Sequence, residues 1–141
     1  MTPKQIIVQI PNQPGQLAKL SELFSLNGLN IRAISAHMFK DEGLVTMVLD
    51  DHEKGKMVLT GHGYEVGETR VIAARTPDHP GSMNAVIKPL NEAGVNIERL
   101  YVSVTVPDEI PYVIIEVDDY EKALVTLKAN YVSLIEGGLK F

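Results

Sequence analysis

Two short loops carry the residues whose types suit the binding of a small molecule. They read Asn12-Gln13-Pro14-Gly15 and Asp78-His79-Pro80-Gly81, and each stands where an apolar run ends and a helical pattern begins. An asparagine amide both donates and accepts hydrogen bonds, and glycine lets a ligand approach the free backbone N–H groups of a helix start. These groups match the carboxylate and ammonium of an α-amino acid.

A second pair of matched segments follows the loops at constant spacing. Gly28-Leu29-Asn30-Ile31 follows the first loop, and Gly94-Val95-Asn96-Ile97 follows the second. Loops and segments are both offset by 66 residues, without insertion or deletion between them. A repeat of this length is the size of a small domain, so we infer that a whole domain is duplicated.

Strand and helix patterns in the first half occur in the order βαββαβ. Alternating apolar residues predict strands at 6–10, 31–39, 44–49 and 64–66, and helical spacing predicts helices beginning near Pro14 and Asp50. We expect Asn12 to cap the first helix and Gly28 to end it. The second helix is weak by its sequence, because Gly55 lies inside it.

The second half repeats this order. Strands are predicted at 71–74, 97–106, 112–117 and 132–135, with one helix pattern from Met83 to Leu90 and another beginning at Asp118. The offset from Asp50 to Asp118 is 68 residues, which makes the second hairpin loop, around residues 107–109, two residues longer. Pro89 conflicts with its helix and is expected to kink or loosen the last turn at a cost of ~3 kcal/mol.

These elements predict an α+β fold of two ferredoxin-like units. Right-handed crossovers place the first strand of each unit inside the sheet and the second at an edge. Because an exposed edge needs a partner, we expect the two second strands to pair. The predicted result is two units side by side, forming one eight-stranded antiparallel sheet with helices on one face. We assign the first domain to residues 1–67 and the second to residues 68–141.

Composition narrows the classes of function. With 45% hydrophobic and 22% charged residues among 141, the chain has the composition of a soluble globular protein. It contains no cysteine, and its histidines lack the spacing of metal ligands, so we expect no metal site and no cofactor. A net charge of −5 argues against nucleic acid. Without a membrane-span or secretion-signal pattern, we expect a cytoplasmic protein that does not bind membranes.

The two signatures together resemble the ACT domain, a small regulatory module that binds amino acids and related metabolites. The resemblance covers nearly the whole chain, from about Lys4 to Ile135, and implies tandem ACT repeats without an attached catalytic domain. It further implies that ligand binds between two ACT units, held by the Asn/Asp-x-Pro-Gly loop of one and by the asparagine that opens the second strand of the other.

Geometry leads to the same arrangement. A helix of about 14 residues spans roughly 20 Å, so Asn12 and Asn30 cannot hold one small molecule. A two-fold axis between the copies would bring Asn12 near Asn96, and Asp78 near Asn30. Because Asp78 repels a carboxylate, the first of these clefts is favoured. The expected first cleft comprises Asn12, Gln13, Pro14, Gly15, Gln16, Leu17, Val95, Asn96 and Ile97, and the second Asp78, His79, Pro80, Gly81, Ser82, Met83, Leu29, Asn30 and Ile31.

Structural roles for the same residues stay open. An Asn-x-Pro-Gly loop by itself is usually a turn and helix cap, and Asn30 and Asn96 also suit the end of a helix. Asp50-Asp51 and Asp118-Asp119 are interpreted as helix caps rather than catalytic acids. No nucleophile has an evident histidine and acid partner, so we identify no catalytic residue.

Three hypotheses follow for function. The first is a non-enzymatic amino-acid sensor in which a ligand bridges the repeats, with a homodimer of the chain permitted. The second, suggested by the similarity of the first copy to the regulatory subunit of acetohydroxyacid synthase, is an interaction subunit of a metabolic enzyme. The third, a small enzyme of the acylphosphatase type, is disfavoured because neither loop carries an arginine-containing phosphate cradle.

Overall fold

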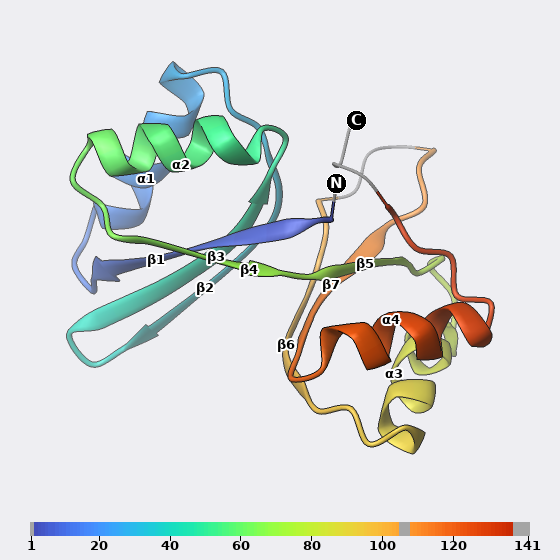
Figure 1. Ribbon diagram of the computed structural model, residues 1–141. Helices are drawn as coiled ribbons and strands as arrows, with labels where there is room; N and C mark the ends of the chain where they lie inside the picture. Colours follow the sequence, from blue (N-terminus) through green and yellow to red (C-terminus); the bar gives the residue numbers. More distant parts are fainter. Residues whose placement is uncertain (1, 105–107, 137–141) are drawn as a thin grey trace. The chain divides into compact units, whose positions relative to one another are not determined.

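The computed structural model describes residues 2–104 and 108–136, which divide into two compact units (Figure 1). The first unit is Lys4–Thr69, and the described part of the second consists of residues 2–3, 70–104 and 108–136. Within the described residues, no helix is long and apolar enough to cross a membrane.

The first unit contains the predicted βαββαβ order. Its elements are β1 (Lys4–Pro11), α1 (Gln16–Leu26), β2 (Ile31–Phe39), β3 (Glu42–Leu49), α2 (His52–Gly61) and β4 (Val66–Arg70). The strand order is β2-β3-β1-β4, so the first strand lies inside the sheet and the second at an edge, as predicted. The fourth strand begins at the last residue of the predicted segment 64–66 and continues to Arg70.

The second unit has the same plan with a reduced last strand. Its elements are β5 (Ile72–Arg75), α3 (Ser82–Glu92), β6 (Ile97–Val102), β7 (Tyr112–Val117) and α4 (Tyr120–Ala129), with strand order β5-β7-β6. The strand predicted at 132–135 is a single bridge between Ala74 and Leu134. The predicted strand 97–106 ends earlier, and its last two residues and Pro107 lie outside the described residues.

The prediction of one eight-stranded sheet is wrong. The described residues form one sheet of four strands and one of three, and β2 pairs only with β3, and β6 only with β7. Both predicted edge strands have a shift of register near their start, between Ile31 and Ala33 and between Ile97 and Arg99. Such irregularities twist an edge strand and disfavour pairing with another edge.

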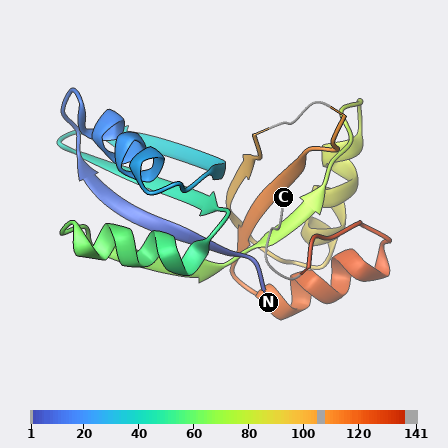
Figure 2. The same ribbon diagram turned by 90° about the horizontal axis from the view of Figure 1, so that it is seen from above.

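Each unit has its own hydrophobic core between the sheet and its two helices. Figures 1 and 2 show α1 and α2 over one face of the first sheet, where Leu20, Phe24 and Leu59 are buried against alternate residues of β1 and β3. In the second unit, Val86, Leu90 and Leu127 of α3 and α4 pack in the same way.

Gly55 has a packing role that the sequence does not reveal. A Cβ atom at this position would lie 2.4 Å from Cδ1 of Leu49 and 3.2 Å from Cδ1 of Ile6. The glycine therefore allows α2 to approach the sheet closely. The corresponding residue of α4 is Ala123, which is also buried, so a small side chain at this helix position is common to both units.

Pro89 lies inside α3, and the helix continues past it to Glu92. The carbonyl of Pro89 accepts a hydrogen bond from the N–H of Ala93, and the N–H of Val95 donates to Leu90. The last turn is therefore closed by backbone bonds that do not need the missing N–H of proline.

The two second helices end in the same hydrogen-bond pattern with different residues. In α2 the left-handed position is Gly63, with φ 84°, and Tyr64 N–H donates to Leu59. In α4 it is Tyr131, with φ 60°, and Val132 N–H donates to Leu127. The Tyr131 side chain is 96% exposed, so packing does not offset its backbone strain.

Replacing Tyr131 by glycine should stabilise the protein. We expect Tyr131→Gly to raise the free energy of unfolding by roughly 0.5–1 kcal/mol, because glycine adopts the left-handed conformation without steric cost. The matched change Gly63→Ala should lower it by a similar amount. Urea denaturation measures both. A destabilising effect of Tyr131→Gly would mean that the exposed ring contributes to folding.

Candidate functional site

Asn12, in the first candidate loop, forms hydrogen bonds with the turn between β2 and β3 and not with the helix that follows the loop. Asn12 N–H donates to the carbonyl of Asp41 at 2.8 Å, and its side-chain Nδ2 donates to the carbonyl of Lys40 at 2.7 Å. The N-cap of α1 is Gly15, in the left-handed region at φ 87°, and no side chain caps the helix. The expectation that Asn12 caps this helix is therefore wrong, because its amide is used by the hairpin turn.

The starts of α1 and α3 are built alike. Gln16 N–H donates back to Gln13 in the first unit, and Ser82 N–H donates back to His79 in the second, both at 3.3 Å. The next helical bonds run from Lys19 N–H to Gly15 and from Ala85 N–H to Gly81. Two N–H groups of each first turn therefore have no backbone acceptor among the described residues: those of Leu17 and Ala18, and those of Met83 and Asn84. Gly81, like Gly15, is a left-handed N-cap without side-chain capping.

Asn30 and Asn96 are each fixed by an aspartate that follows the next strand. Asp50 Oδ1 accepts from the N–H of Asn30 at 2.9 Å, and Asp50 N–H donates to the carbonyl of Asn30 at 3.0 Å. Asp118 makes the same two contacts with Asn96, at 3.0 and 3.1 Å. The backbone of each asparagine is thus held, and no other described residue forms a hydrogen bond with its side-chain amide.

These aspartates have a role that the sequence analysis missed. The helix caps are the following residues, because Asp51 accepts from Lys54 N–H and Asp119 from Lys122 N–H, both at 3.1 Å. Asp50 and Asp118 are therefore free to reach back to the asparagines. The signal in the sequence was the acidic doublet, which occurs at matching places in both copies although one cap needs only one acid.

Within each unit the loop and the asparagine lie at opposite ends of the sheet. Asn12 follows Pro11, which pairs with Glu42, whereas Asn30 precedes Ile31, which pairs with Leu49. Seven residues of β3 at about 3.3 Å each separate these ends by roughly 23 Å. Five residues of β7 separate the ends of the second sheet by roughly 17 Å.

The other predicted site residues divide into exposed loop residues and core residues. Gln13, Pro14, Asp78, His79 and Pro80 are exposed, and Leu17 is 39% exposed. Leu29 and Val95 are buried in the two cores, and Ile31, Met83 and Ile97 pack partly against those cores. Each predicted cleft takes residues from both units, so its assembly stays a prediction.

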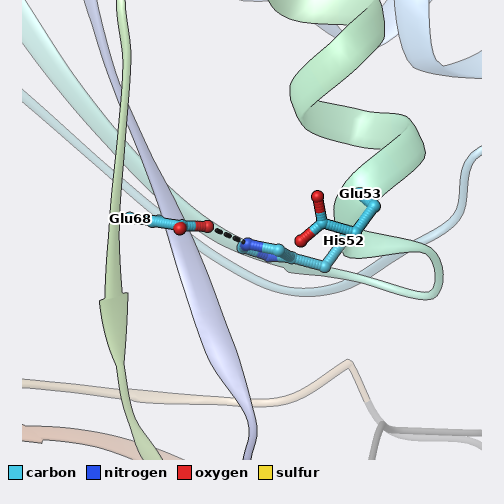
Figure 3. A group of neighbouring side chains, drawn as sticks. All are labelled: His52, Glu53 and Glu68. Carbon is cyan, nitrogen blue, oxygen red and sulfur yellow. Dashed lines mark hydrogen bonds and ion pairs between the residues drawn. The ribbon is translucent and has the colours of Figure 1, made fainter. Parts of the chain in front are cut away.

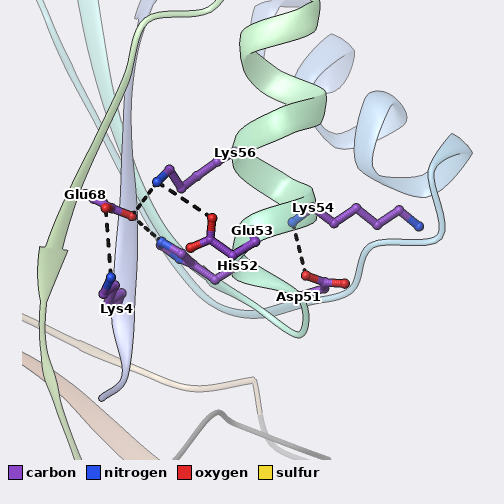
Figure 4. A network of polar contacts seen from close by, with 7 residues as sticks. All are labelled: Lys4, Asp51, His52, Glu53, Lys54, Lys56 and Glu68. Atoms are coloured by element: carbon purple, nitrogen blue, oxygen red, sulfur yellow. Dashed lines mark hydrogen bonds and ion pairs between the residues drawn. The ribbon is translucent and has the colours of Figure 1, made fainter. Parts of the chain in front are cut away.

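A cluster outside the predicted site brings three potential metal ligands together. Ligand atoms of His52, Glu53 and Glu68 all lie within 4.8 Å of one another (Figure 3). Figure 4 shows that lysines already form ion pairs with both glutamates. Lys56 Nζ lies 3.0 Å from Glu68 and 3.9 Å from Glu53, and Lys4 Nζ lies 3.9 Å from Glu68. A metal ion would have to compete with these ammonium groups.

Glu68 is the centre of this cluster. Its hydrogen bond from His52, at 2.6 Å, and that from Lys56 lower the pKa of its carboxyl from 4.5 to about 2. The same contact with Glu68 raises the pKa of Lys56. The residues come from α2, β1 and β4, so no local sequence pattern announces the cluster.

A cavity of about 270 Å³ lies in the second unit and contains none of the predicted ligand-binding residues. It is lined by Thr2, Pro3, Val71, Ile72, Ala73, Tyr120, Leu124, Leu134, Ile135 and Glu136. Its walls are mostly apolar, and both candidate loops lie outside it.

Removing Asp50 should loosen Asn30 specifically. We expect Asp50→Ala to speed amide hydrogen exchange at Asn30 roughly tenfold or more, because a hydrogen bond to a charged group is lost. The control Asp51→Ala should instead speed exchange at Lys54. Equal effects of both variants at Asn30 would contradict the assignment of Asp50.

Replacing Glu68 by glutamine should lower stability at neutral pH by up to about 1 kcal/mol, since its ion pairs are partly solvated. The folded-state pKa is depressed, so the carboxylate stabilises fully above pH 4.5 and loses its effect as the pH falls toward about 2. The difference between wild type and Glu68→Gln should therefore shrink across that window. Urea denaturation at several pH values measures it. The control Glu53→Gln should have a smaller effect, because the only ion pair of Glu53 is a 3.9 Å contact with Lys56 among the described residues. A stability difference between wild type and Glu68→Gln that does not change with pH would contradict the role of Glu68.

Comparisons with known proteins agree with this architecture. No curated protein matches the chain. Among solved structures, protein BT0572 from Bacteroides thetaiotaomicron is 25% identical, with a TM-score of 0.87 over 96% of this chain and 92% of that one. The regulatory subunit of aspartate kinase from Thermus thermophilus shares the fold at 19% identity, with a TM-score of 0.65 over 92% and 91% of the two chains. Residues 1–138 match the family described as the ACT domain pair, and the chain therefore belongs to that family.

Proposed function

We propose that this chain is a non-catalytic regulatory protein that binds a free amino acid between two ACT repeats, taken as residues 1–67 and 68–141. The observation that carries the proposal is the separation within each unit. A helix start with available N–H groups and an asparagine with a fixed backbone stand roughly 23 Å apart in the first unit. One small ligand can contact both kinds of group only if they come from different repeats.

The proposed contacts in the first cleft follow from what each group already binds. The N–H groups of Leu17 and Ala18 receive the ligand carboxylate, assisted by the dipole of α1. Because Nδ2 of Asn12 donates to Lys40, its Oδ1 is the atom that accepts from the ligand ammonium. The side-chain amide of Asn96 completes the polar contacts. The backbone of this residue is held by its hydrogen bond to Asp118.

The proposed second cleft pairs the loop of Asp78 with Asn30. The same kinds of N–H groups are offered by Met83 and Asn84. The Asp78 carboxylate, however, favours the ammonium and repels the carboxylate of the same ligand. We therefore expect the first cleft to bind more tightly.

Regulation requires that the ligand favour one relative orientation of the repeats, which a partner then senses. The second candidate is an interaction subunit of an amino-acid biosynthetic enzyme such as acetohydroxyacid synthase. It is favoured by the shared fold with an aspartate kinase regulatory subunit, a likeness of architecture alone. The two candidates differ in copurification from the source cell, because the second requires an enzyme at near-equal stoichiometry. Both suit a cytoplasmic protein, as a monomer or as a homodimer.

A thermal-shift screen of the common amino acids tests the sensor. At a concentration of about 100 Kd, a specific ligand should add ~2.7 kcal/mol to the free energy of unfolding. This gain should be lost in both Asn12→Ala and Asn96→Ala and kept in the matched variant Asp78→Ala.

Other outcomes are equally informative. Loss in Asn30→Ala and Asp78→Ala, with retention in Asn12→Ala, would move the site to the second cleft. A specific ligand whose effect survives all four substitutions would overturn both clefts.

A further inference from the structure

The cavity of the second unit lies beside a strand edge whose hydrogen bonds are incomplete. Every residue that lines it belongs to that unit, so the cavity is a feature of one unit alone. It lies between the start of β5 and the first two turns of α4 (Figure 1). Its volume of about 270 Å³ is close to the lower end of the range of about 300–1,000 Å³ for ligand sites. The cavity therefore has the size of a site for a small ligand.

β5 uses alternate residues on its two edges, as the strands of an antiparallel ladder do. On the edge away from β7, the carbonyl of Ala73 accepts from Ile135 N–H, and Arg75 N–H donates to Ser133, both at 2.8 Å. The N–H of Ala73 points to the same edge as its carbonyl. It has no hydrogen-bond acceptor among the described residues, because the segment 132–135 forms only one bridge with β5.

Val71, which lies between β4 and β5, has an unpaired carbonyl for a different reason. Its N–H donates to the carbonyl of Pro3 at 3.0 Å, and Gln5 is bonded to Thr69, so the two segments run antiparallel. Opposite residues that share one such bond normally exchange a second, from the N–H of the other residue. Proline has no N–H, so the carbonyl of Val71 receives no donor from Pro3. No other described residue supplies one.

These two groups form a donor–acceptor pair at the cavity. Val71 and Ala73 are two residues apart, so the carbonyl of the first and the N–H of the second point to the same side of the chain. Both residues line the cavity together with Pro3 and Ile135, and both are buried, at 0% and 1% exposed. Buried backbone groups are nearly always satisfied in native proteins. The pair therefore requires an occupant that accepts from Ala73 and donates to Val71.

We propose that this cavity binds a small neutral molecule that carries a primary amide and an apolar tail. The oxygen of the amide accepts from the N–H of Ala73, and an N–H of the same amide donates to the carbonyl of Val71. A primary amide supplies both roles without a charge. A single water molecule can make the same two bonds, but it occupies only about 30 Å³ and leaves most of the cavity to be filled.

The walls of the cavity favour an uncharged ligand with an apolar tail. Tyr120, Leu124 and Leu134 provide apolar surface for the tail. Glu136, the charged residue on the wall, is exposed and forms an ion pair with Lys128. Its carboxylate repels an anionic ligand, and a charged group would lose its hydration among the apolar walls. A free amino acid carries two charges and is disfavoured, so this site goes beyond the proposed sensor and is distinct from both of its clefts.

An NMR titration of the full chain with isocaproamide tests the site. We expect a saturable shift of the backbone amide resonance of Ala73. The matched ketone, methyl isoamyl ketone, carries a methyl group in place of the amide NH₂, so it accepts from Ala73 but cannot donate to Val71. It should bind roughly fivefold more weakly, because one hydrogen bond to a buried carbonyl is lost. Free leucine should cause no shift at Ala73.

Three variants locate the two hydrogen bonds and the tail. Pro3→Ala supplies an N–H opposite Val71, so the preference for the amide over the ketone should disappear while the shift at Ala73 remains. Leu124→Trp fills the cavity and should abolish binding of both probes. Its control is Val125→Trp, at the neighbouring position of α4 that is 68% exposed, which should bind as the unaltered protein does.

The amide and the ketone are compared in the unaltered protein, so the central result does not depend on the folding of a variant. Absence of a saturable shift at Ala73 would overturn the site and leave water as the occupant. Equal affinities of the two probes in the unaltered protein, or equal effects of Leu124→Trp and Val125→Trp, would also overturn it. Asn12→Ala and Asn96→Ala should leave amide binding unchanged. A failed amino-acid screen would overturn the proposed sensor and leave this result standing.

Discussion

The direction of three strands is the constraint on which the rest of the structure depends. In the first unit β3 pairs antiparallel with both β1 and β2, so the end of β1 and the beginning of β2 lie at opposite ends of the sheet, measured along the strands. The second unit repeats this with β5, β7 and β6. A single repeat therefore cannot bring its loop and its asparagine to one small ligand.

The two repeats share this plan but differ where local demands differ. Gly55 lets α2 approach the sheet, and the corresponding position in α4 tolerates Ala123. Gly63 and Tyr131 occupy the same left-handed position at very different conformational cost. The second repeat also reduces its last strand to one bridge.

Much of the fold could be predicted from the sequence because local patterns determine it. The limits of β2 and β7 match the expected residues 31–39 and 112–117, since alternation of apolar residues reports which side chains face the core. Pairing between edges was not predictable, because it depends on register shifts that alternation does not encode. Gly55 was interpreted as a weakness for the same reason: the sequence does not show what lies beneath a helix.

For the candidate site, the sequence indicated the loops and asparagines but not the groups that hold them. Asn12 was expected to cap a helix, but its side-chain amide donates to the carbonyl of Lys40, which is distant in sequence. Asp50 was interpreted as a cap, although its neighbour Asp51 serves that purpose. The Glu68 cluster combines three elements and has no local signature. Contacts between residues that are distant in sequence could not be predicted from a single sequence.

The bond between Pro3 and Val71 has a consequence for how the protein is made. The carbonyl of Pro3 meets its donor, the N–H of Val71, only after the whole first repeat and the start of the second have been synthesised. Until then the N-terminal end of β1 is incomplete, and closing so long a loop is entropically costly. We expect this contact to form late in folding, after each core has collapsed.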